Sequence, residues 1–306
     1  MKAVVFEEFG GPEVLHEAEV AAPEPGPRQV RVRVHAAGVN PIDWKIRKGL
    51  MQPNLPPKLP SIPGSEAAGV VEAVGAEVSG FAPGDAVFGW TRGGGYCEQA
   101  VLVMFAPKPT ALSFEQAAAL PLAGETAERG LRALKVGAGD TLLIHGASGA
   151  VGSYAVQLAV GRGARVIGTA GPRNQDYVAS LGAEPAVYGD GLVERVRALA
   201  PDGVDAVFDV AGRGVLGESI ELRGGTTDRI LTLADREGSE KYKVSYSGGP
   251  KDSIQSPELL AELAGKAVGG ELKITISEVY PLADAARAQR DSEAGHGRGK
   301  QILAVS

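Results

Sequence analysis

A glycine-rich segment near the middle of the chain has the residue types and the spacing that bind a phosphate group. Residues 141–144 predict a strand and residues 150–161 a helix, and Gly146, Gly149 and Gly152 lie at their junction. A glycine lets the backbone approach a pyrophosphate closely, and the amides at a helix N-terminus favour an anion. We expect a dinucleotide to bind here, with a structural glycine turn in another α/β protein as the alternative. The residues expected to contact its diphosphate are Gly149, Ala150, Val151 and Gly152.

The end of the next predicted strand bears on the choice of cofactor. A site specific for NAD places Asp or Glu about 20 residues after the glycines, where it binds the ribose 2′-hydroxyl. Here Thr169 and Arg173 occupy that region, and Asp176 comes too late. A hydroxyl and a guanidinium suit a 2′-phosphate. The sequence therefore favours NADPH over NADH, with a solvent-exposed arginine at a helix start as the alternative for Arg173.

Composition limits the other kinds of chemistry. The 306 residues carry a net charge of −6, 44% are hydrophobic, and Cys97 is the only cysteine. A single cysteine excludes an intramolecular disulfide and any zinc site that needs two thiolates from one chain. The four histidines are scattered, and no apolar run approaches the ~18 residues of a membrane span. We expect a cytoplasmic protein with no metal and with neither nucleic acid nor membrane as a partner.

The elements around the glycines divide the chain into two patterns. Before residue 113, short apolar runs separated by Gly and Pro predict an antiparallel barrel or sandwich, and Val30, Val32 and Val34 alternate with arginines. From Ser113, whose Gln116 completes a capping-box pattern, strands and helices alternate. That alternation predicts a parallel sheet with helices on both faces.

Several segments together resemble the medium-chain dehydrogenase/reductase superfamily, and specifically its zinc-free quinone oxidoreductase (zeta-crystallin-like) branch. The resemblance covers nearly the whole chain in order. Its segments are AAGVNPIDWK (36–45), PGSEAAGVV (63–71), VG (74–75), PGDAV (83–87), GYCE (95–98), HGASGAVG (145–152), LGA (181–183), GVDAVFD (203–209) and RGK (298–300).

The resemblance implies the architecture and the absence of zinc. It implies an α/β protein with a GroES-like β-barrel catalytic domain over residues 1–113 and 251–306, and a Rossmann NADPH-binding domain, a doubly wound parallel sheet, over 114–250. Zinc-dependent relatives carry Cys where this chain has Asn40 and His where it has Ser65, so two ligands are missing. Glu66 beside them cannot hold zinc alone. The branch transfers hydride from NADPH to acceptors that delocalise charge, such as quinones or the C=C bond of enones.

The same resemblance assigns roles near the reacting atoms. Asn40 and Asp43 are expected on a loop that faces the nicotinamide, with a plain Asn-Pro turn as the alternative for Asn40. Lys45 is expected to stabilise the enolate that forms on hydride addition, unless it is an exposed lysine. We expect catalysis from Asn40, Asp43 and Lys45.

Further cofactor contacts follow from the family match and from the ends of Rossmann strands. Thr126 corresponds to a threonine near the nicotinamide and the diphosphate, with a threonine in the first turn of a helix as the alternative. Tyr188 corresponds to a tyrosine near the adenosine phosphate, with a half-buried strand tyrosine as the alternative. Ala211 and Leu233 follow strands at the edge where such sheets bind ligands. The sequence leaves open whether Tyr242 or Tyr246 lines the substrate pocket.

The function expected is therefore NADPH-dependent reduction of a small quinone or enone without zinc. A low-turnover NADPH-binding structural or regulatory protein and a pathway-specific tailoring reductase are the alternatives. We also expect a homodimer, because an exposed last strand near residues 230–234 or 242–246 is a surface that proteins pair or protect.

Overall fold

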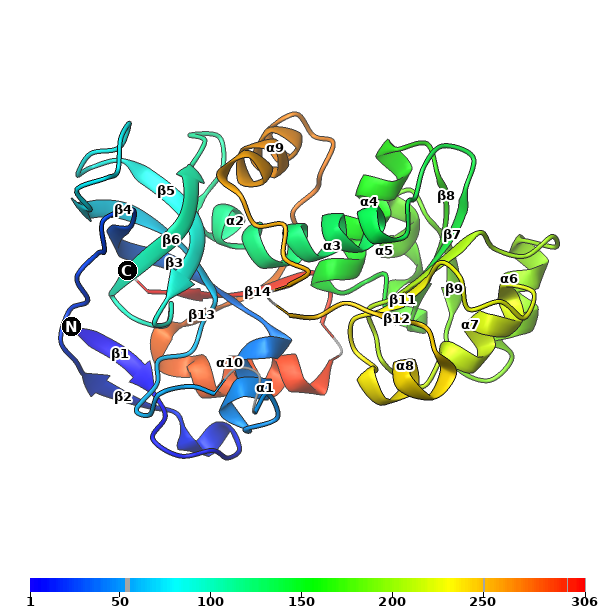
Figure 1. Cartoon of the computed structure of the whole chain (residues 1–306), viewed down its shortest axis with the longest axis horizontal. Coiled ribbons are helices and arrows are strands. Elements are labelled where there is room, and N and C mark those ends of the chain that lie inside the picture. The colour runs from blue at the N-terminus through cyan, green and yellow to red at the C-terminus, as the bar shows by residue number, and fades with distance from the viewer. Residues whose placement is uncertain (53–55, 250, 296, 306) are drawn as a thin grey trace. The chain divides into compact units, whose positions relative to one another are not determined.

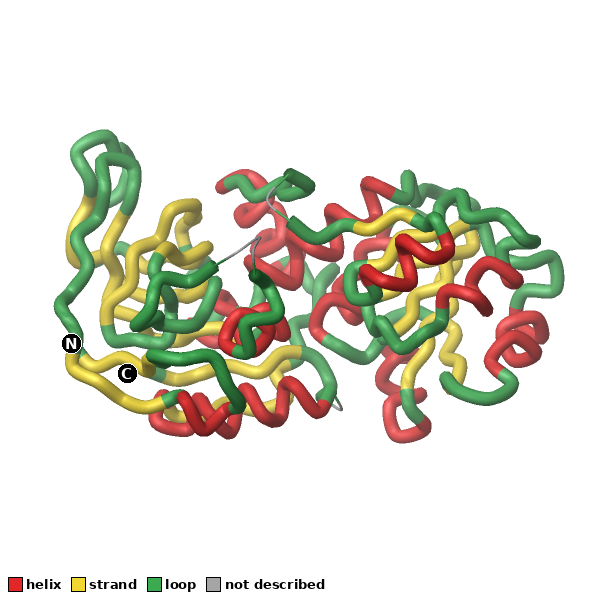
Figure 2. The backbone as a smooth tube through the Cα atoms, turned by 60° about the horizontal axis from the view of Figure 1, so that its bottom comes forward, coloured by secondary structure: helices red, strands yellow, loops and turns green. Residues whose placement is uncertain are grey.

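The computed structural model describes residues 1–52, 56–249, 251–295 and 297–305. Its chain forms two compact units (Figures 1 and 2). The barrel unit contains Met1–Leu122, Gln255–Gly269 and Ile274–Ser306, and the Rossmann unit contains Ala123–Ile254 and Gly270–Lys273. Residue 250, the last residue of the expected Rossmann domain, lies outside the described residues.

The barrel unit is built on one six-stranded sheet that closes on itself. Its order is β13-β14-β3-β4-β5-β6, and β3 also pairs with β6. The strands are β3 (Val30–Val39), β4 (Glu66–Val74), β5 (Ala86–Arg92), β6 (Gln99–Pro107), β13 (Ile276–Pro281) and β14 (Lys300–Ala304), with β1 (Lys2–Val5) and β2 (His16–Glu19) forming a separate pair. Val30, Val32 and Val34 are fully buried, which confirms the alternation expected from the sequence.

Short helices cover parts of this barrel. They are α1 (Pro41–Arg47), α2 (Phe114–Ala118), α9 (Pro257–Val268) and α10 (Ala285–Ala294), with 3-10 turns η1 (Pro12–Val14) and η3 (Leu282–Asp284). The predicted capping box at the start of α2 is present, because Gln116 N donates to Ser113 Oγ at 3.2 Å and Ser113 N donates to Gln116 Oε1 at 2.9 Å.

The Rossmann unit has a parallel sheet in the order β12-β11-β10-β7-β8-β9. Its strands are β7 (Thr141–His145), β8 (Arg165–Ala170), β9 (Glu184–Val187), β10 (Ala206–Asp209), β11 (Ile230–Thr232) and β12 (Ser245–Tyr246). The helices are α3 (Pro121–Ala133), α4 (Ala150–Gly161), α5 (Gln175–Ser180), α6 (Leu192–Leu199), α7 (Leu216–Leu222) and α8 (Arg236–Tyr242), with the 3-10 turn η2 (Pro172–Asn174). Strand order reverses between β7 and β10, and such a reversal is where open α/β sheets bind ligands.

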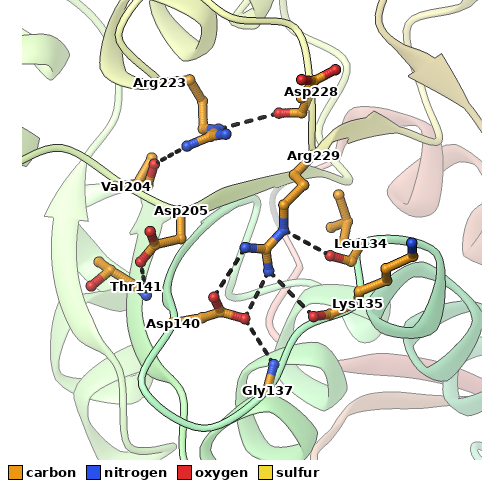
Figure 3. A network of polar contacts seen from close by, with 10 residues as sticks. All are labelled: Leu134, Lys135, Gly137, Asp140, Thr141, Val204, Asp205, Arg223, Asp228 and Arg229. Carbon is orange, nitrogen blue, oxygen red and sulfur yellow. Dashed lines mark hydrogen bonds and ion pairs between the residues drawn. The ribbon is translucent and has the colours of Figure 1, made fainter.

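A polar network ties together the amino ends of three of these strands (Figure 3). Arg229, just before β11, donates two hydrogen bonds to the carboxylate of Asp140, at 3.0 and 2.7 Å, and another to the carbonyl of Leu134. Asp205, just before β10, accepts from the backbone N–H of Thr141 at 2.7 Å. This network lies at the amino ends of the strands, whereas the glycine loop lies at their carboxyl ends. We therefore assign the network to stabilising the fold.

Candidate active site

The glycine loop connects β7 to α4 and leaves the start of that helix open to an anion. Gly149 is the N-cap residue, and no side chain caps the helix there. A Cβ at Gly152 would lie 2.1 Å from the carbonyl oxygen of Gly146, so only glycine fits at that position. The amides of the first turn therefore have the partial positive charge that favours a diphosphate.

A series of hydrogen bonds connects this loop to buried side chains of the Rossmann unit. The backbone N–H of Gly146 donates to Thr169 Oγ1 at 3.3 Å, and Thr169 Oγ1 lies 3.4 Å from His145 Nδ1. His145 Nε2 lies 3.1 Å from Ser219 Oγ, whose own hydrogen goes to the carbonyl of Val215. Ser219 must therefore accept from Nε2–H, which makes Nδ1 the acceptor for the Thr169 hydroxyl. Burial lowers the pKa of His145 to about 4, so the ring is neutral at physiological pH.

Thr169 thus uses its hydroxyl inside the protein, and its side chain is fully buried. Arg173 is exposed on η2, just beyond the end of β8. Tyr188, 48% exposed after β9, lies against Gly171, where a Cβ would be 3.2 Å from the tyrosine hydroxyl. The structure therefore places Arg173 and Tyr188 at neighbouring strand ends, with Thr169 beneath them.

The loops after β10 and β11 are organised by one buried carboxylate. Asp209 Oδ1 accepts from the backbone N–H groups of Ala211 and Gly212, both at 2.9 Å, and Asp209 Oδ2 accepts from Thr232 Oγ1 at 2.7 Å. The backbone N–H of Leu233 also donates to the carbonyl of Asp209. Ala211 and Leu233 therefore retain their carbonyl oxygens, and not their N–H groups, for a ligand.

Thr126 lies in α3 of the Rossmann unit and is half-buried. Its hydroxyl donates to Glu125 Oε2 at 3.3 Å. Glu125 is buried and also accepts from Arg129 Nε and from the backbone N–H of Ile254, each at 3.0 Å. The hydroxyl oxygen of Thr126 remains an acceptor.

In the barrel unit, two buried side chains of opposite charge meet the amide of Asn40. The end of β3 lies beside the starts of β14 and β4, which brings Asn40, Lys300 and Glu66 together. Lys300 Nζ donates to Asn40 Oδ1 and to Glu66 Oε1, and Asn40 Nδ2 donates to Glu66 Oε1 at 2.7 Å. The backbone N–H of Leu122 donates to Glu66 Oε2 at 2.6 Å. A Cβ at Gly38 would lie 2.1 Å from Glu66 Oε1, so the glycine makes room for the carboxylate.

Asp43 forms the second part of this cluster. Its carboxylate accepts from the backbone N–H of Asn40 at 2.9 Å, from Tyr96 OH at 3.0 Å and from Ser65 Oγ at 3.2 Å. Burial raises the pKa of Asp43 to about 6, although the hydrogen bonds from the Asn40 N–H and from Tyr96 and the charge of Lys300 oppose the rise. Burial, followed by the charge of Asp43, also raises the pKa of Tyr96. Asp43 can therefore hold or release a proton near neutral pH.

Lys45 is separate from the cluster. It is half-buried on α1 two residues after Asp43, and residues two apart do not share a helix face. Its Nζ lies 5.5 Å from the ring centroid of Trp44, and burial lowers the pKa of Lys45. No carboxylate pairs with Lys45 among the residues that the structure describes. The structure thus joins Asn40 and Asp43 but leaves Lys45 on its own.

Three members of the cluster had no role in the prediction from sequence: Glu66, Tyr96 and Lys300. Each had a signal, because Glu66 and Lys300 are charged residues that open apolar strands, and Tyr96 lies between glycine and the buried Cys97. Cys97 itself takes no part, and burial raises the pKa of its thiol to about 12.

Comparisons with known proteins identify the family. Residues 26–106 match the alcohol dehydrogenase GroES-like domain, and residues 181–303 match the family described as zinc-binding dehydrogenase. Mouse quinone oxidoreductase is 34% identical over 99% of this chain and 97% of its own length. The chain therefore belongs to the medium-chain dehydrogenase/reductase superfamily, a superfamily of enzymes, and within it to the quinone oxidoreductase branch.

Solved structures agree with this assignment. The Escherichia coli quinone oxidoreductase complexed with NADPH is 30% identical, with a TM-score of 0.85 and full coverage of both chains. A structure described as an NAD-dependent alcohol dehydrogenase is 34% identical, with a TM-score of 0.87 and full coverage of both chains. These proteins confirm the expected fold, a GroES-like barrel with a Rossmann sheet.

The zinc named in one family description does not fit the residues present here. Within the described ranges, no three His, Cys, Asp or Glu side chains come together as a metal site would require. At the positions that correspond to zinc ligands, the Ser65 hydroxyl donates to Asp43 and Asn40 Oδ1 accepts from Lys300. The Glu66 carboxylate is already paired with an ammonium. In the same described part of the chain, no helix is long and apolar enough to cross a membrane.

Proposed function

We propose that this protein is an NADPH-dependent oxidoreductase that reduces a quinone or an α,β-unsaturated carbonyl compound without zinc. The observation that carries the proposal is the uncapped start of α4 behind Gly146–Gly152, at the reversal of strand order. Its support comes from full-length similarity to quinone oxidoreductases, one of which has been solved with NADPH.

In this proposal the Rossmann unit binds the cofactor, which supplies a hydride when bound. The amides of Ala150, Val151 and Gly152 hold the diphosphate, since they form the open first turn of α4. Arg173 and Tyr188 bind the 2′-phosphate end, because they lie at the ends of the adjacent strands β8 and β9. The segment 169–173 after β8 carries no carboxylate that would repel this phosphate. Thr169 contributes through the amide of Gly146.

Three other groups orient the nicotinamide. The carbonyl oxygens of Ala211 and Leu233 accept from its carboxamide, since their N–H groups are already used. The Thr126 hydroxyl oxygen provides a further acceptor. Positioning of this kind supplies much of the rate acceleration in hydride transfer.

The barrel unit stabilises the acceptor. Hydride addition to a quinone or enone places negative charge on the carbonyl oxygen, and a fixed N–H donor or a cation stabilises that charge. Asn40 supplies the donor and Lys45 the cation in this proposal. Asp43 is the nearby group whose pKa of about 6 suits proton exchange.

A spectrophotometric assay of NADPH oxidation tests the proposal with a panel of quinones and enones, each repeated with NADH. We expect turnover with at least one acceptor class and faster turnover with NADPH. Tight NADPH binding without turnover would favour a structural or regulatory protein instead. Faster turnover with NADH would contradict the proposed cofactor. It would instead resemble the cofactor use named for the NAD-dependent alcohol dehydrogenase of similar structure.

Zinc independence needs its own measurement. Elemental analysis of the active protein should find zinc well below one ion per chain, and a chelator should leave the rate unchanged. Stoichiometric zinc with activity lost to the chelator would overturn this part of the proposal. A pathway-specific acceptor, larger than the panel compounds, is the remaining alternative if cofactor binds and all small acceptors fail.

We also propose a cytoplasmic homodimer. β12 is the last strand of its sheet and pairs only with β11 among the described strands, which leaves one edge for a second copy. Lys241 and Lys243 are exposed beside it, and charge of this kind also protects monomeric edges. Light scattering at micromolar concentration decides the point, because the mass of a single chain would refute the dimer.

A further inference from the structure

We propose that Lys300 is a positioning residue: its ammonium holds the Asn40 amide in one orientation, so that Asn40 can only donate a hydrogen bond to the acceptor oxygen. This inference rests on the proposed function, which assigns Asn40 to the acceptor. It goes further by giving a task to a lysine that lies 260 positions away in the sequence.

The first support is burial combined with the pairing of opposite charges. Lys300 is 1% exposed, Glu66 0% and Asn40 2%, so the three side chains are shielded from bulk water. Each Glu66 oxygen accepts from at least one N–H, and Oε1 accepts from both Lys300 and Asn40. In such a dry cluster an unmatched polar group is costly, so the hydrogen-bond pattern is strongly determined.

The second support is the direction of each hydrogen bond at Asn40. An ammonium has donors and no acceptor, and a carboxylate has acceptors and no donor. If the Asn40 amide turned over, its NH2 group would face the Lys300 ammonium and its oxygen would face the Glu66 carboxylate. Both contacts would then be repulsive. The observed orientation uses Oδ1 and one Nδ2 hydrogen. In the proposal, the second Nδ2 hydrogen is the donor to the acceptor oxygen.

The third support is that stability alone gives little reason for a buried pair such as Lys300 and Glu66. A buried ion pair adds little stability over neutral residues of similar size, because desolvation offsets the attraction. Stability alone therefore does not account for Lys300 and Glu66. Fixing the orientation of an amide that stabilises developing negative charge does account for them, since a fixed donor needs no rearrangement during the reaction.

Two variants separate positioning from charge neutralisation. Lys300→Met leaves the Glu66 carboxylate buried without its cation and should lower the melting temperature. Lys300→Met/Glu66→Gln removes both charges, and an amide at position 66 accepts either orientation of Asn40. Lys266→Met/Glu262→Gln is the matched control, because that Lys–Glu pair lies on the surface of α9 with N–O separation of 3.6 Å.

We expect the double variant to recover the melting temperature but not the turnover. Its kcat with a quinone should stay about tenfold or more below wild type, with the KM for NADPH changed less than twofold, because only stabilisation of the acceptor is lost. The control should resemble wild type in both measurements. Recovery of kcat together with the melting temperature would overturn the inference and leave Lys300 as a counter-ion.

A second readout does not need activity. The sequence has three asparagines, Asn40, Asn54 and Asn174, so labelling with 15N-asparagine gives three pairs of side-chain amide signals, assigned with Asn54→Gln and Asn174→Gln. We expect one sharp pair for Asn40 in wild type and a doubled or exchange-broadened pair in Lys300→Met/Glu66→Gln. A single sharp pair in both proteins would refute positioning. Failure of wild type to reduce any acceptor would instead refute the proposed function, and the spectra would still test the orientation.

Discussion

Two cation–carboxylate pairs lie in different surroundings and use different cations. Lys300 and Glu66 are at most 1% exposed, whereas the side chains of Arg229 and Asp140 are 32% and 20% exposed. The Arg229 guanidinium spans both oxygens of Asp140 and also reaches the carbonyl of Leu134 (Figure 3). The Lys300 ammonium instead joins the Asn40 amide, at the start of α1, to the Glu66 carboxylate, at the start of β4.

The difference shows how the shape of the cation suits its task. A planar guanidinium with fixed donors matches one carboxylate and neighbouring carbonyls, and it fastens the partly wet amino ends of β7 and β11. A compact ammonium can serve acceptors that lie in separate directions within a dry cluster. The partly exposed pair of Arg229 and Asp140, here called the wet pair, should therefore be replaceable at a modest cost in unfolding free energy. The buried pair of Lys300 and Glu66, here called the dry pair, should be sensitive to loss of either partner.

The largest effect should come from removing the cation of the dry pair. Lys300→Met leaves an uncompensated buried carboxylate, which costs about 3–5 kcal/mol of unfolding free energy. Urea unfolding followed by circular dichroism measures the change. A loss below about 1 kcal/mol would show that the cluster is more hydrated than its burial indicates, and would remove the contrast with Arg229.

Arg173 extends the comparison to the carboxyl ends of the Rossmann strands. It is exposed, and its proposed partner is a ligand and not a carboxylate of the protein. Arg173→Ala should weaken NADPH binding by about 1.5–3 kcal/mol, roughly tenfold or more, and change NADH binding little, since only NADPH carries the 2′-phosphate. Titration of each cofactor by intrinsic fluorescence measures both constants. Equal losses for the two cofactors would show that Arg173 has a structural role.

The dry cluster should also make stability depend on pH. Burial raises the pKa of Asp43 from 3.8 to about 6, so the folded protein binds this proton more tightly than the unfolded chain does. This contribution to stability is full below pH 3.8 and is lost as the pH rises through 6. Between pH 4 and pH 7 the loss is about 2 kcal/mol.

Comparison with Asp43→Asn isolates this contribution from other titrating groups. The difference in unfolding free energy between wild type and the variant should shift by about 2 kcal/mol over the same pH range, to the disadvantage of wild type at pH 7. A difference that stays constant with pH would mean that the Asp43 pKa is close to its ordinary value.

The smallest effect should come from the wet pair. Arg229→Ala removes the contacts to Asp140 and to the carbonyl of Leu134, yet water can reach both partners, so the loss should be about 1–2 kcal/mol. The rate of NADPH oxidation should not change, because Arg229 lies at the amino ends of the strands. A stability loss as large as that of Lys300→Met would show that exposure does not distinguish the two pairs.

Much of the fold was predictable because its signals are local. The alternation at Val30–Val34, the capping box at Ser113 and the glycines between β7 and α4 each depend on residues within a few positions of one another. α8 and β12 were not resolved by such signals, since Arg236–Tyr242 is a short polar helix and Ser245–Tyr246 a strand of two residues. Tyr242 ends that helix and Tyr246 lies in that strand, 36% exposed and half-buried respectively.

Sequence alone determined that a glycine loop with the spacing of a diphosphate site follows a strand, that positions 40 and 65 lack the Cys and His of zinc-dependent relatives, and that Asn40 and Asp43 lie three residues apart. Only the tertiary structure decided what those side chains do. The partners of Asn40 come from residues 66 and 300, and they meet because antiparallel pairing puts the starts of β4 and β14 beside the end of β3. Thr169 likewise faces His145 because parallel pairing of β7 and β8 aligns them. Contacts across strands follow register, and no spacing along the chain encodes them.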